Sequence, residues 1–300
     1  FLPLTFAFLI LPAIVFAKIE VDITASDDKT LRQVHVSGSN VDIISDLERD
    51  TFQLTEANLK SSVKAYFGSQ PDDVFVRSPT PWGDLYITNE WKQVSRVLKP
   101  VKAKILSVVS KPILVMTHEF NNTSSKQSTF EARMKQEVEN TIASTWERSG
   151  EIAASNYIKY GLDMKAMAVE GQATFSYISK WGENVMKSQT VSVGAETAVT
   201  ITLEPNQRAT AKLYATRVSM KVEIDYEASL FGSVVVNFAD AYKGHHFWSF
   251  DINKVMAAGG LAHAVPSSEV IDIEFYANSK VVILDSLTDD VLYTLPLTNL

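Results

Sequence analysis

The chain contains no cysteine among its 300 residues. This excludes a disulfide framework, a thiol nucleophile and any zinc or iron–sulfur site that depends on cysteine ligands. The sequence also lacks a glycine-rich phosphate loop, a nucleophile elbow and a His-Glu-x-x-His metal motif. His245 and His246 are adjacent, so on a strand they would point to opposite faces instead of sharing one metal ion. We therefore expect no cofactor, no metal site and no enzymatic activity.

Positive charge is scarce as well. The chain has 28 Lys and Arg residues against 35 Asp and Glu, which gives a net charge of −7 at pH 7, and no dense basic run appears. Because phosphate binding relies on clustered Lys and Arg, nucleic acid is not an expected partner. Attraction to anionic lipid is not indicated for the same reason.

The first seventeen residues are almost wholly apolar and end in Val15-Phe16-Ala17. Small residues at this spacing precede signal-peptidase cleavage sites, so residues 1–17 are predicted to be a signal peptide that is cut after Ala17. A membrane anchor is the alternative, but the run is shorter than the roughly 20 residues that a spanning helix needs, and Pro3 and Pro12 interrupt it. We expect a secreted, extracellular protein.

The sequence Asn121-Asn122-Thr123-Ser124 contains two overlapping glycosylation motifs. Asn121 and Asn122 are therefore both candidate N-glycosylation sites, and the pattern marks a surface loop.

Helical and strand patterns are mixed at the start of the chain. Residues 18–24 alternate as a strand, and 34–44 are a second candidate strand. A helical pattern opens at Thr55 and ends at Gly68, which occupies the position of a C-terminal cap. A second short helix is expected over residues 89–98. Together these segments predict a compact α+β head.

Three large aromatic residues lie in this head: Trp82, Tyr86 and Trp91. They are candidates for stacking against a sugar ring. Filling a small core is the alternative, because large aromatic side chains dominate burial.

Strand patterns dominate the rest of the chain. Residues 191–203 alternate between apolar and polar side chains, and residues 214–228 alternate more regularly still. The second run is nearly three times the mean strand length of about 5–6 residues, so the sheets should be elongated. The sequence thus predicts a mainly β, elongated protein with an N-terminal head over 18–108 and a β stem over 109–300.

The centre of the stem is a candidate membrane-inserting hairpin over about residues 130–178. Residues 130–146 fit a strand better than a helix, residues 148–160 suit a turn, and a return strand follows over 167–177. The candidate membrane-facing residues lie on one face of this pair: Phe130, Met134, Val138, Ile142, Trp146, Val169, Phe175 and Tyr177.

Such a pair is the unit that a transmembrane β-barrel needs, since each strand must supply about 9–11 alternating residues. One hairpin cannot close a barrel, so insertion would require a ring of several copies. Gln136, Asn140 and Ser144 interrupt the apolar face. A half-buried strand pair in a soluble sheet is therefore the alternative.

The chain resembles a known family over roughly residues 82–238. The motif Phe120-Asn121-Asn122-Thr123-Ser124 with Gln127, then Trp181-Gly182, then residues 199–207 follow the order found in the epsilon-toxin and mosquitocidal-toxin branch of aerolysin-like proteins. Residues 82–100 of the head look more like spherulin-like and insect follicular-epithelium yolk proteins.

This resemblance implies an elongated β-protein with a head and a stem module that holds a stowed hairpin. In the toxin members, protomers bind a cell-surface receptor, form homo-oligomers and extend the hairpin into a membrane barrel. The expected partners are therefore other copies of this chain, membrane lipid, and a cell-surface glycan or protein receptor. The yolk resemblance implies a non-lytic storage or egg-coat role, and a carbohydrate-binding module is a third hypothesis.

Overall fold

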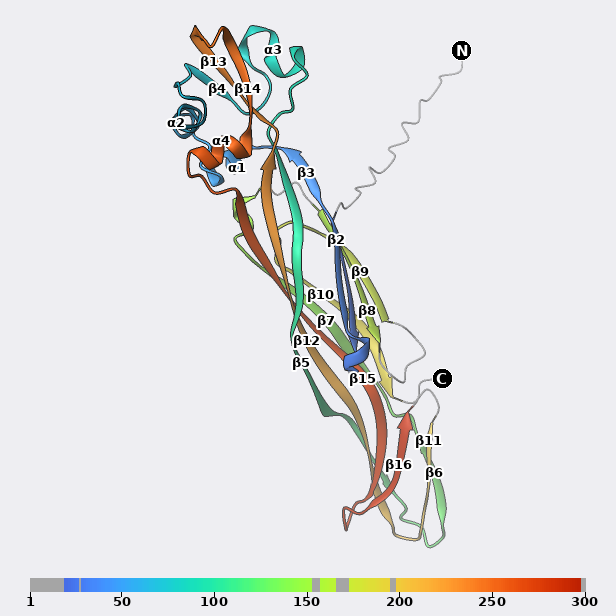
Figure 1. The fold of residues 1–300 in the computed structure, drawn as a ribbon. Helices are drawn as coiled ribbons and strands as arrows, with labels where there is room; N and C mark the ends of the chain where they lie inside the picture. Colours follow the sequence, from blue (N-terminus) through green and yellow to red (C-terminus); the bar gives the residue numbers. More distant parts are fainter. Residues whose placement is uncertain (1–18, 27, 153–156, 166–172, 195–197, 298–300) are drawn as a thin grey trace, which may run out of the picture.

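The computed structural model describes residues 19–26, 28–152, 157–165, 173–194 and 198–297. Over these residues the molecule is a long body of β-strands with its α-helices gathered in a head at one end (Figure 1). This confirms the mainly β, elongated fold with a small α+β head. The predicted signal peptide lies outside the described residues. Within the described ranges, no helix is both long and apolar enough to span a membrane.

The head combines four α-helices with a three-stranded sheet. Its elements are α1 (Asp46–Thr51), α2 (Glu56–Phe67), α3 (Pro81–Thr88), α4 (Ile252–Ala258), β4 (Asp73–Phe75), β13 (Ser233–Tyr242) and β14 (His245–Asp251). Helix α2 confirms the helix expected from Thr55. The Thr55 side chain accepts a hydrogen bond from the Asn58 backbone, and Gly68 ends the helix with a φ of 99°.

The prediction of a helix over residues 89–98 is wrong. A helix forms earlier, as α3, and the chain then runs as strand β5 (Ser95–Asn121). The apolar residues of this segment have helical spacing, but β5 pairs with β12 (Arg208–Phe231) over almost its full length. This long-range pairing overrides the local pattern.

The body is built on a sheet that runs for most of its length. Its strand order is β10 (Val185–Gly194), β7 (Lys135–Glu147), β15 (Ala264–Asp285), β12, β5 and β3 (Asn40–Ile43), and β16 (Val291–Leu297) pairs with β15. Strand β12 has 24 residues whose burial alternates along nearly the whole strand. The alternation seen in the sequence over 214–228 is thus one buried and one wetter face of this long strand.

A smaller sheet covers one face of this main sheet. Its strand order is β2 (Gln33–Gly38), β1 (Ile19–Ser26), β8 (Tyr157–Lys165) and β9 (Ala173–Lys180), and the two sheets share one hydrophobic core. At the end away from the head, β6 (Ser128–Ala132) and β11 (Val199–Leu203) form a separate pair (Figure 1).

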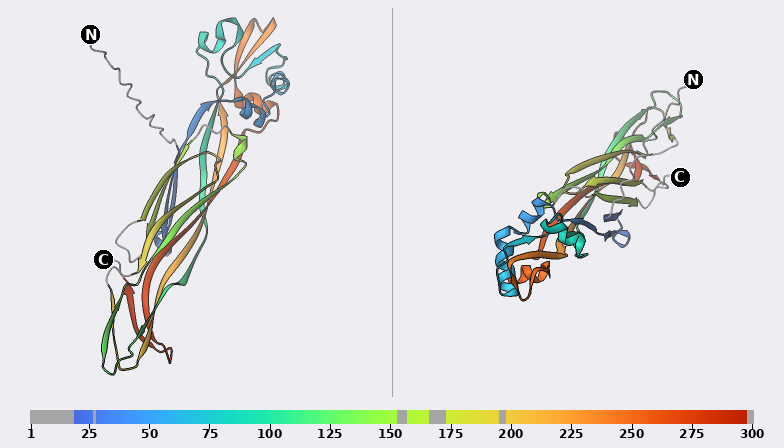
Figure 2. Two further views of the ribbon diagram at one scale, coloured as in Figure 1. Left: turned by 180° about the vertical axis from the view of Figure 1, so that it is seen from behind. Right: turned by 90° about the horizontal axis from the view of Figure 1, so that it is seen from above.

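The structure divides the chain differently from the expected head at 18–108. Strands β1 and β2 lie along the body beside β8 and β9, whereas β13, β14 and α4, from residues 233–258, return to the head (Figures 1 and 2). Viewed from above, the helices from both parts of the chain gather at one end of the body (Figure 2). The chain passes between body and head four times, through the short strand β3 and the long strands β5, β12 and β15, so a single cut in the sequence cannot separate the two parts.

Candidate functional site

The segment predicted as the first strand of the hairpin is extended, as expected. It forms β6 and β7, with a break at Arg133 and Met134. Its pairing was predicted incorrectly, because β7 pairs with β10 and β15, and β6 pairs with β11. Alternation defines the faces of a strand but not its neighbour, which explains the error.

The expected return strand belongs to a separate hairpin. Strand β9 pairs with β8, with Tyr160 opposite Tyr177 and Leu162 opposite Phe175. Strand β8 starts within the segment expected to be a turn, and Val169 lies outside the described residues.

The three strand pairs are nested in sequence. β8–β9 is enclosed by β7–β10, which is in turn enclosed by β6–β11. The candidate module is therefore longer than the predicted range of 130–178 and spans residues 128–203. Its inner part, the β8–β9 hairpin, packs on the main sheet instead of continuing the line of β7 and β10.

The β8–β9 hairpin has one apolar and one polar face. The inward side chains are apolar or aromatic and lie in the shared core: Ile158, Tyr160, Leu162, Met164, Phe175 and Tyr177. The exposed residues of the outward face are Lys159, Thr174, Ser176 and Ile178, and three of these four side chains are polar. Strand β1 runs parallel to β8 on the other edge, where the Lys159 Nζ atom lies 3.1 Å from Glu20 Oε1.

Four of the five membrane-facing residues predicted over 130–146 pack into the protein in this conformation. Met134 and Ile142 are buried, and Phe130, Val138 and Trp146 are half-buried. The Trp146 ring stacks on Tyr226 with centroids 5.2 Å apart. Met134, Ile142, Phe130 and Trp146 pack in or against the hydrophobic core, and membrane contact would require them to move.

A buried carboxylate lies between the hairpin and the main sheet. Glu269 of β15 has no exposed surface. Its Oε1 atom accepts hydrogen bonds from Ser144 Oγ of β7 at 2.5 Å and Tyr160 OH of β8 at 2.8 Å. Its Oε2 atom accepts one from Tyr226 OH of β12 at 3.0 Å. We call Ser144, Tyr160, Tyr226 and Glu269 the Glu269 cluster.

The cluster shifts the protonation of its members. Burial raises the pKa of Glu269 to about 7, although the three hydroxyl donors act in the opposite direction. Burial and the neighbouring carboxylate raise the pKa values of Tyr160 and Tyr226 well above their ordinary range, so both hydroxyls keep their protons. Glu269 was not among the residues predicted from the sequence, although it occupies the same alternation phase as the buried Ile271, Ile273 and Phe275.

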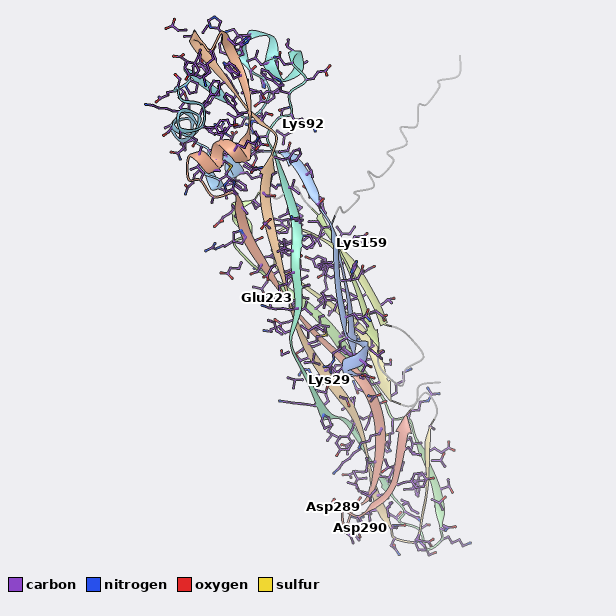
Figure 3. The ribbon with its side chains drawn as sticks, in the orientation of Figure 1. Lys29, Lys92, Lys159, Glu223, Asp289 and Asp290 are labelled. Atoms are coloured by element: carbon purple, nitrogen blue, oxygen red, sulfur yellow. The ribbon has the colours of Figure 1, made fainter. Side chains whose placement is uncertain are left out.

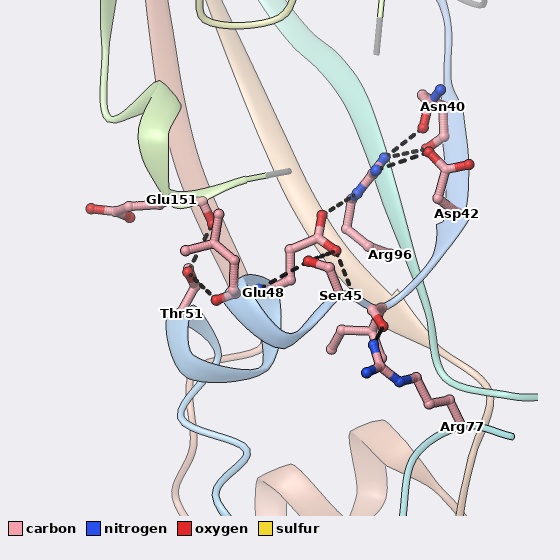
Figure 4. A network of polar contacts seen from close by, with 10 residues as sticks. Asn40, Asp42, Ser45, Glu48, Thr51, Arg77, Arg96 and Glu151 are labelled. Atoms are coloured by element: carbon pink, nitrogen blue, oxygen red, sulfur yellow. Dashed lines mark hydrogen bonds and ion pairs between the residues drawn. The ribbon is translucent and has the colours of Figure 1, made fainter. Parts of the chain in front are cut away.

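A second polar network joins the head to the body (Figure 4). Arg96 of β5 is fully buried, and its Nε donates to Glu48 Oε1 of α1 at 2.8 Å. The same guanidinium contacts Asn40 Oδ1 at 2.7 Å and Asp42 Oδ2 at 3.1 Å, both on β3. We call this network the neck.

The head aromatics do not form one surface. Tyr86 is 3% exposed and its hydroxyl lies 2.9 Å from the carbonyl oxygens of Phe75 and Ser233, so it is a core residue and not a recognition residue. Trp91 is half-buried and packs against the same small core. Trp82 is 48% exposed on a turn with a positive φ of 62°, which leaves it as the accessible member of the three.

The two glycosylation candidates also differ. Asn121 is exposed, whereas Asn122 is 1% exposed. The Asn122 Nδ2 atom, to which a glycan would be attached, lies within hydrogen-bond distance of the carbonyl oxygens of Lys126, Leu203 and Glu204. The folded structure therefore contradicts Asn122 as an acceptor, and Asn121 stays a prediction.

Charged and metal-binding groups are dispersed. In Figure 3, Lys92, Lys159 and Lys29 lie at separate heights along the molecule, so these basic residues do not form one patch. In the part of the chain that the structure describes, no group of three or more His, Asp or Glu residues could hold a metal ion. The His246 ring instead lies 2.8 Å from the Phe238 carbonyl oxygen.

The chain is similar to megalopygitoxins over most of its length. It is 32% identical over 252 residues to U-megalopygitoxin(8)-Mc8 of Megalopyge crispata, which covers 84% of this chain and 86% of that protein. It is 33% identical over 267 residues to U-megalopygitoxin(8)-Mo15 of Megalopyge opercularis, which covers 88% of this chain and 84% of that protein. No protein-family model matches the chain.

The fold is similar to that of a solved toxin. Parasporin-2 of Bacillus thuringiensis, a toxin that recognizes cancer cells, superposes with a TM-score of 0.62 at 14% identity, covering 86% of this chain and 100% of that one. At this identity the likeness concerns the fold alone. It confirms the expected aerolysin-like architecture.

Proposed function

The chain belongs to the same family as the U-megalopygitoxin(8) proteins, and from this and its aerolysin-like fold we propose that it is a secreted β-pore-forming toxin. In this proposal the head binds a cell surface, several copies assemble, and each copy contributes one β-hairpin to a membrane barrel. The storage role in eggs stays an alternative prediction. The toxin role is favoured because the named relatives are toxins.

The observation that carries this proposal is the nesting of β8–β9 inside β7–β10. If β8–β9 swings away from the main sheet and its register shifts to match that of β7–β10, β7 can continue into β8 and β9 into β10, which gives one long antiparallel pair. The apolar face that is now buried would then face lipid, and Lys159, Thr174 and Ser176 would face the lumen. Strands β8 and β9 have 9 and 8 described residues, close to the ~9–11 that a transmembrane strand needs.

Assembly follows from the same geometry. A released hairpin has two unpaired edges, and hydrocarbon offers no partner for their backbone groups. Neighbouring hairpins from other copies satisfy these groups when they close a ring. The proposed pore is therefore a homo-oligomer.

Trp82 is our candidate for the first contact with the target cell. Three consecutive residues, Trp82, Gly83 and Asp84, have positive φ values of 62°, 79° and 58°. Such a conformation costs energy in non-glycine residues and is often kept at binding sites. The turn holds the half-exposed indole against Phe247, with ring centroids 5.1 Å apart, in a position to stack on a glycan or contact a receptor.

A reversible crosslink tests whether hairpin release is needed. Glu20 on β1 and Lys159 on β8 are register partners with exposed side chains, and the native chain has no cysteine to interfere. We expect the oxidised double variant Glu20→Cys/Lys159→Cys to release no dye from sensitive cells or receptor-bearing vesicles. Reduction should restore the release.

The matched control joins Glu131 to Thr200, which are register partners in β6–β11. This pair stays together in the proposed transition, so the oxidised Glu131→Cys/Thr200→Cys variant should remain active. Equal dye release by both oxidised variants would show that β8–β9 does not need to leave the body.

A further inference from the structure

We infer that the Glu269 cluster is a proton-dependent latch: the protonated carboxyl holds the β8–β9 hairpin on the main sheet, and its ionisation favours release. This inference rests on the proposed function, since it concerns the control of the same hairpin. Its basis is the position of one buried carboxyl group between two sheets that must separate.

The contacts join the moving part to the fixed part. Glu269, Ser144 and Tyr226 belong to the main sheet, and Tyr160 reaches them from β8. Tyr160 also stacks on Tyr177 of β9, with ring centroids 4.7 Å apart. Release of the hairpin therefore removes the Tyr160 hydroxyl from Glu269 and opens the carboxyl group to water.

The groups that face Glu269 are hydroxyls and rings. Strand β8 presents Tyr160, β9 presents Tyr177, β12 presents Tyr226 and β7 presents the uncharged Ser144. Among the described residues, the effects that set the protonation of Glu269 are burial and these hydrogen bonds, with no contribution from a basic side chain. An anion buried beside hydroxyls alone is stabilised less than one paired with a cation.

The direction of the pH effect follows from the raised pKa. In the seated state the pKa of Glu269 is about 7, whereas an exposed glutamate has a value of 4.5. The seated state therefore holds the proton more tightly, and protons stabilise it. The packing of the β8–β9 hairpin on the main sheet is most stable below about pH 4.5. Its stability falls as the pH rises to about 7 and changes little above that value. The difference between these two pKa values changes the equilibrium constant between packed and released hairpins by a factor on the order of a hundred.

Thiol reactivity measures this equilibrium in the soluble protein without a membrane. Leu162 on β8 is 4% exposed, so Leu162→Cys should react with a thiol reagent only when the hairpin leaves the body. Ile178 on β9 is 51% exposed, and Ile178→Cys reports the intrinsic reactivity at each pH. Ala211 on β12 is fully buried far along the main sheet, so Ala211→Cys reports global unfolding.

We expect the rate ratio of Leu162→Cys to Ile178→Cys to rise about a hundredfold from pH 4.5 to pH 8, with no matching rise for Ala211→Cys. Adding Glu269→Gln should remove this dependence, because the amide stays neutral while keeping hydrogen-bonding atoms. The inference is overturned if the dependence survives in Glu269→Gln, or if Leu162→Cys reacts only as fast as Ala211→Cys.

A second variant covers the case in which Glu269→Gln does not fold. Tyr160→Phe removes the hydroxyl that crosses to the main sheet and keeps the ring. Because hydrogen bonds to charged groups are stronger than neutral ones, the rate ratio should increase roughly tenfold at pH 8 and less at pH 4.5. An equal increase at both pH values would contradict the latch.

Pore formation is measured separately, by dye release. A pH-dependent thiol ratio without dye release under any receptor condition would leave the latch in place and refute the pore. Dye release together with a thiol ratio that does not depend on pH would refute the latch and leave the pore proposal in place.

Discussion

Replacing Arg96 with Met tests whether the neck fixes the head to the body. Arg96 is fully buried and Glu48 is 1% exposed, so the variant leaves a carboxylate in the interior without its cation. Glu48 keeps the Ser45 backbone N–H and hydroxyl, both at 2.9 Å from Oε2. Asp42 is 42% exposed at its side chain and can be solvated by water when Arg96 is removed.

The cost comes mainly from Glu48. Removing one partner of a buried ion pair typically destabilises a protein by about 3–5 kcal/mol, because the remaining charge stays buried. Unfolding entropy for a chain of this length is about 0.6 kcal/mol/K, so the melting temperature should fall by roughly 5–8 °C. The pKa of Glu48 is lowered in the native protein by its hydrogen bonds and by Arg96, against the effect of burial. Loss of Arg96 should raise it.

Urea unfolding followed by circular dichroism measures the cost, and a double variant tests its cause. Glu48→Gln on the Arg96→Met background removes the buried charge but keeps an acceptor for the Ser45 N–H. We expect the double variant to recover about 1–2 kcal/mol of the loss. If the double variant is no more stable than Arg96→Met alone, uncompensated charge is not the source of the cost. The neck would then act through packing.

Three further predictions concern other parts of the molecule. Trp82→Ala should reduce binding to sensitive cells at least tenfold with less than about 0.5 kcal/mol of lost stability, and Ile87→Ala, which alters another exposed residue of α3, should bind normally. Gly194→Ala should lower the unfolding free energy by more than 2 kcal/mol in urea titrations, because Gly194 has a φ of 121° and a Cβ atom there would lie 2.0 Å from the Met134 carbonyl oxygen. The unfolding free energy of the wild type, relative to that of Glu269→Gln, should fall by about 3 kcal/mol as the pH rises from about 4.5 to about 7. The reason is that the pKa of Glu269 is raised in the folded state, so protonation stabilises this state. If the difference between the two unfolding free energies does not change with pH over this range, the burial argument is refuted.

The sequence predicted those parts of the fold that depend on local patterns. The alternation over 214–228 predicted a long strand with one buried face, and Thr55 and Gly68 marked the ends of α2 because caps act within one turn. The segment 95–121 shows the limit. It forms a strand because β12 lies beside it, and that neighbour is more than 80 residues away in sequence.

The candidate site was predicted only in part. Phe175 and Tyr177 do lie on the apolar face of a hairpin, but their partner strand begins at Tyr157 and not at residue 130. Many strands of this chain share the same alternation, so the pattern could not choose among possible partners. Glu269 gave one usable signal, a carboxylate in the apolar phase of a strand, and such residues are seldom fully buried without a partner.

The alternation of apolar and polar residues in the hairpin is compatible with two states, packed on the protein and inserted in a membrane. The pattern therefore could not distinguish them. A hairpin with one apolar face can pack against a protein core or face lipid, and both environments remove a similar apolar area from water. Apolar contacts alone therefore make only a small difference in free energy between the hairpin packed on the main sheet and the hairpin inserted in a membrane. Polar contacts made in only one state can supply the difference, since they are lost when the strands separate. In the described structure, the hydrogen bond from Tyr160 to Glu269 is such a contact, which places the control of the hairpin in its few polar atoms.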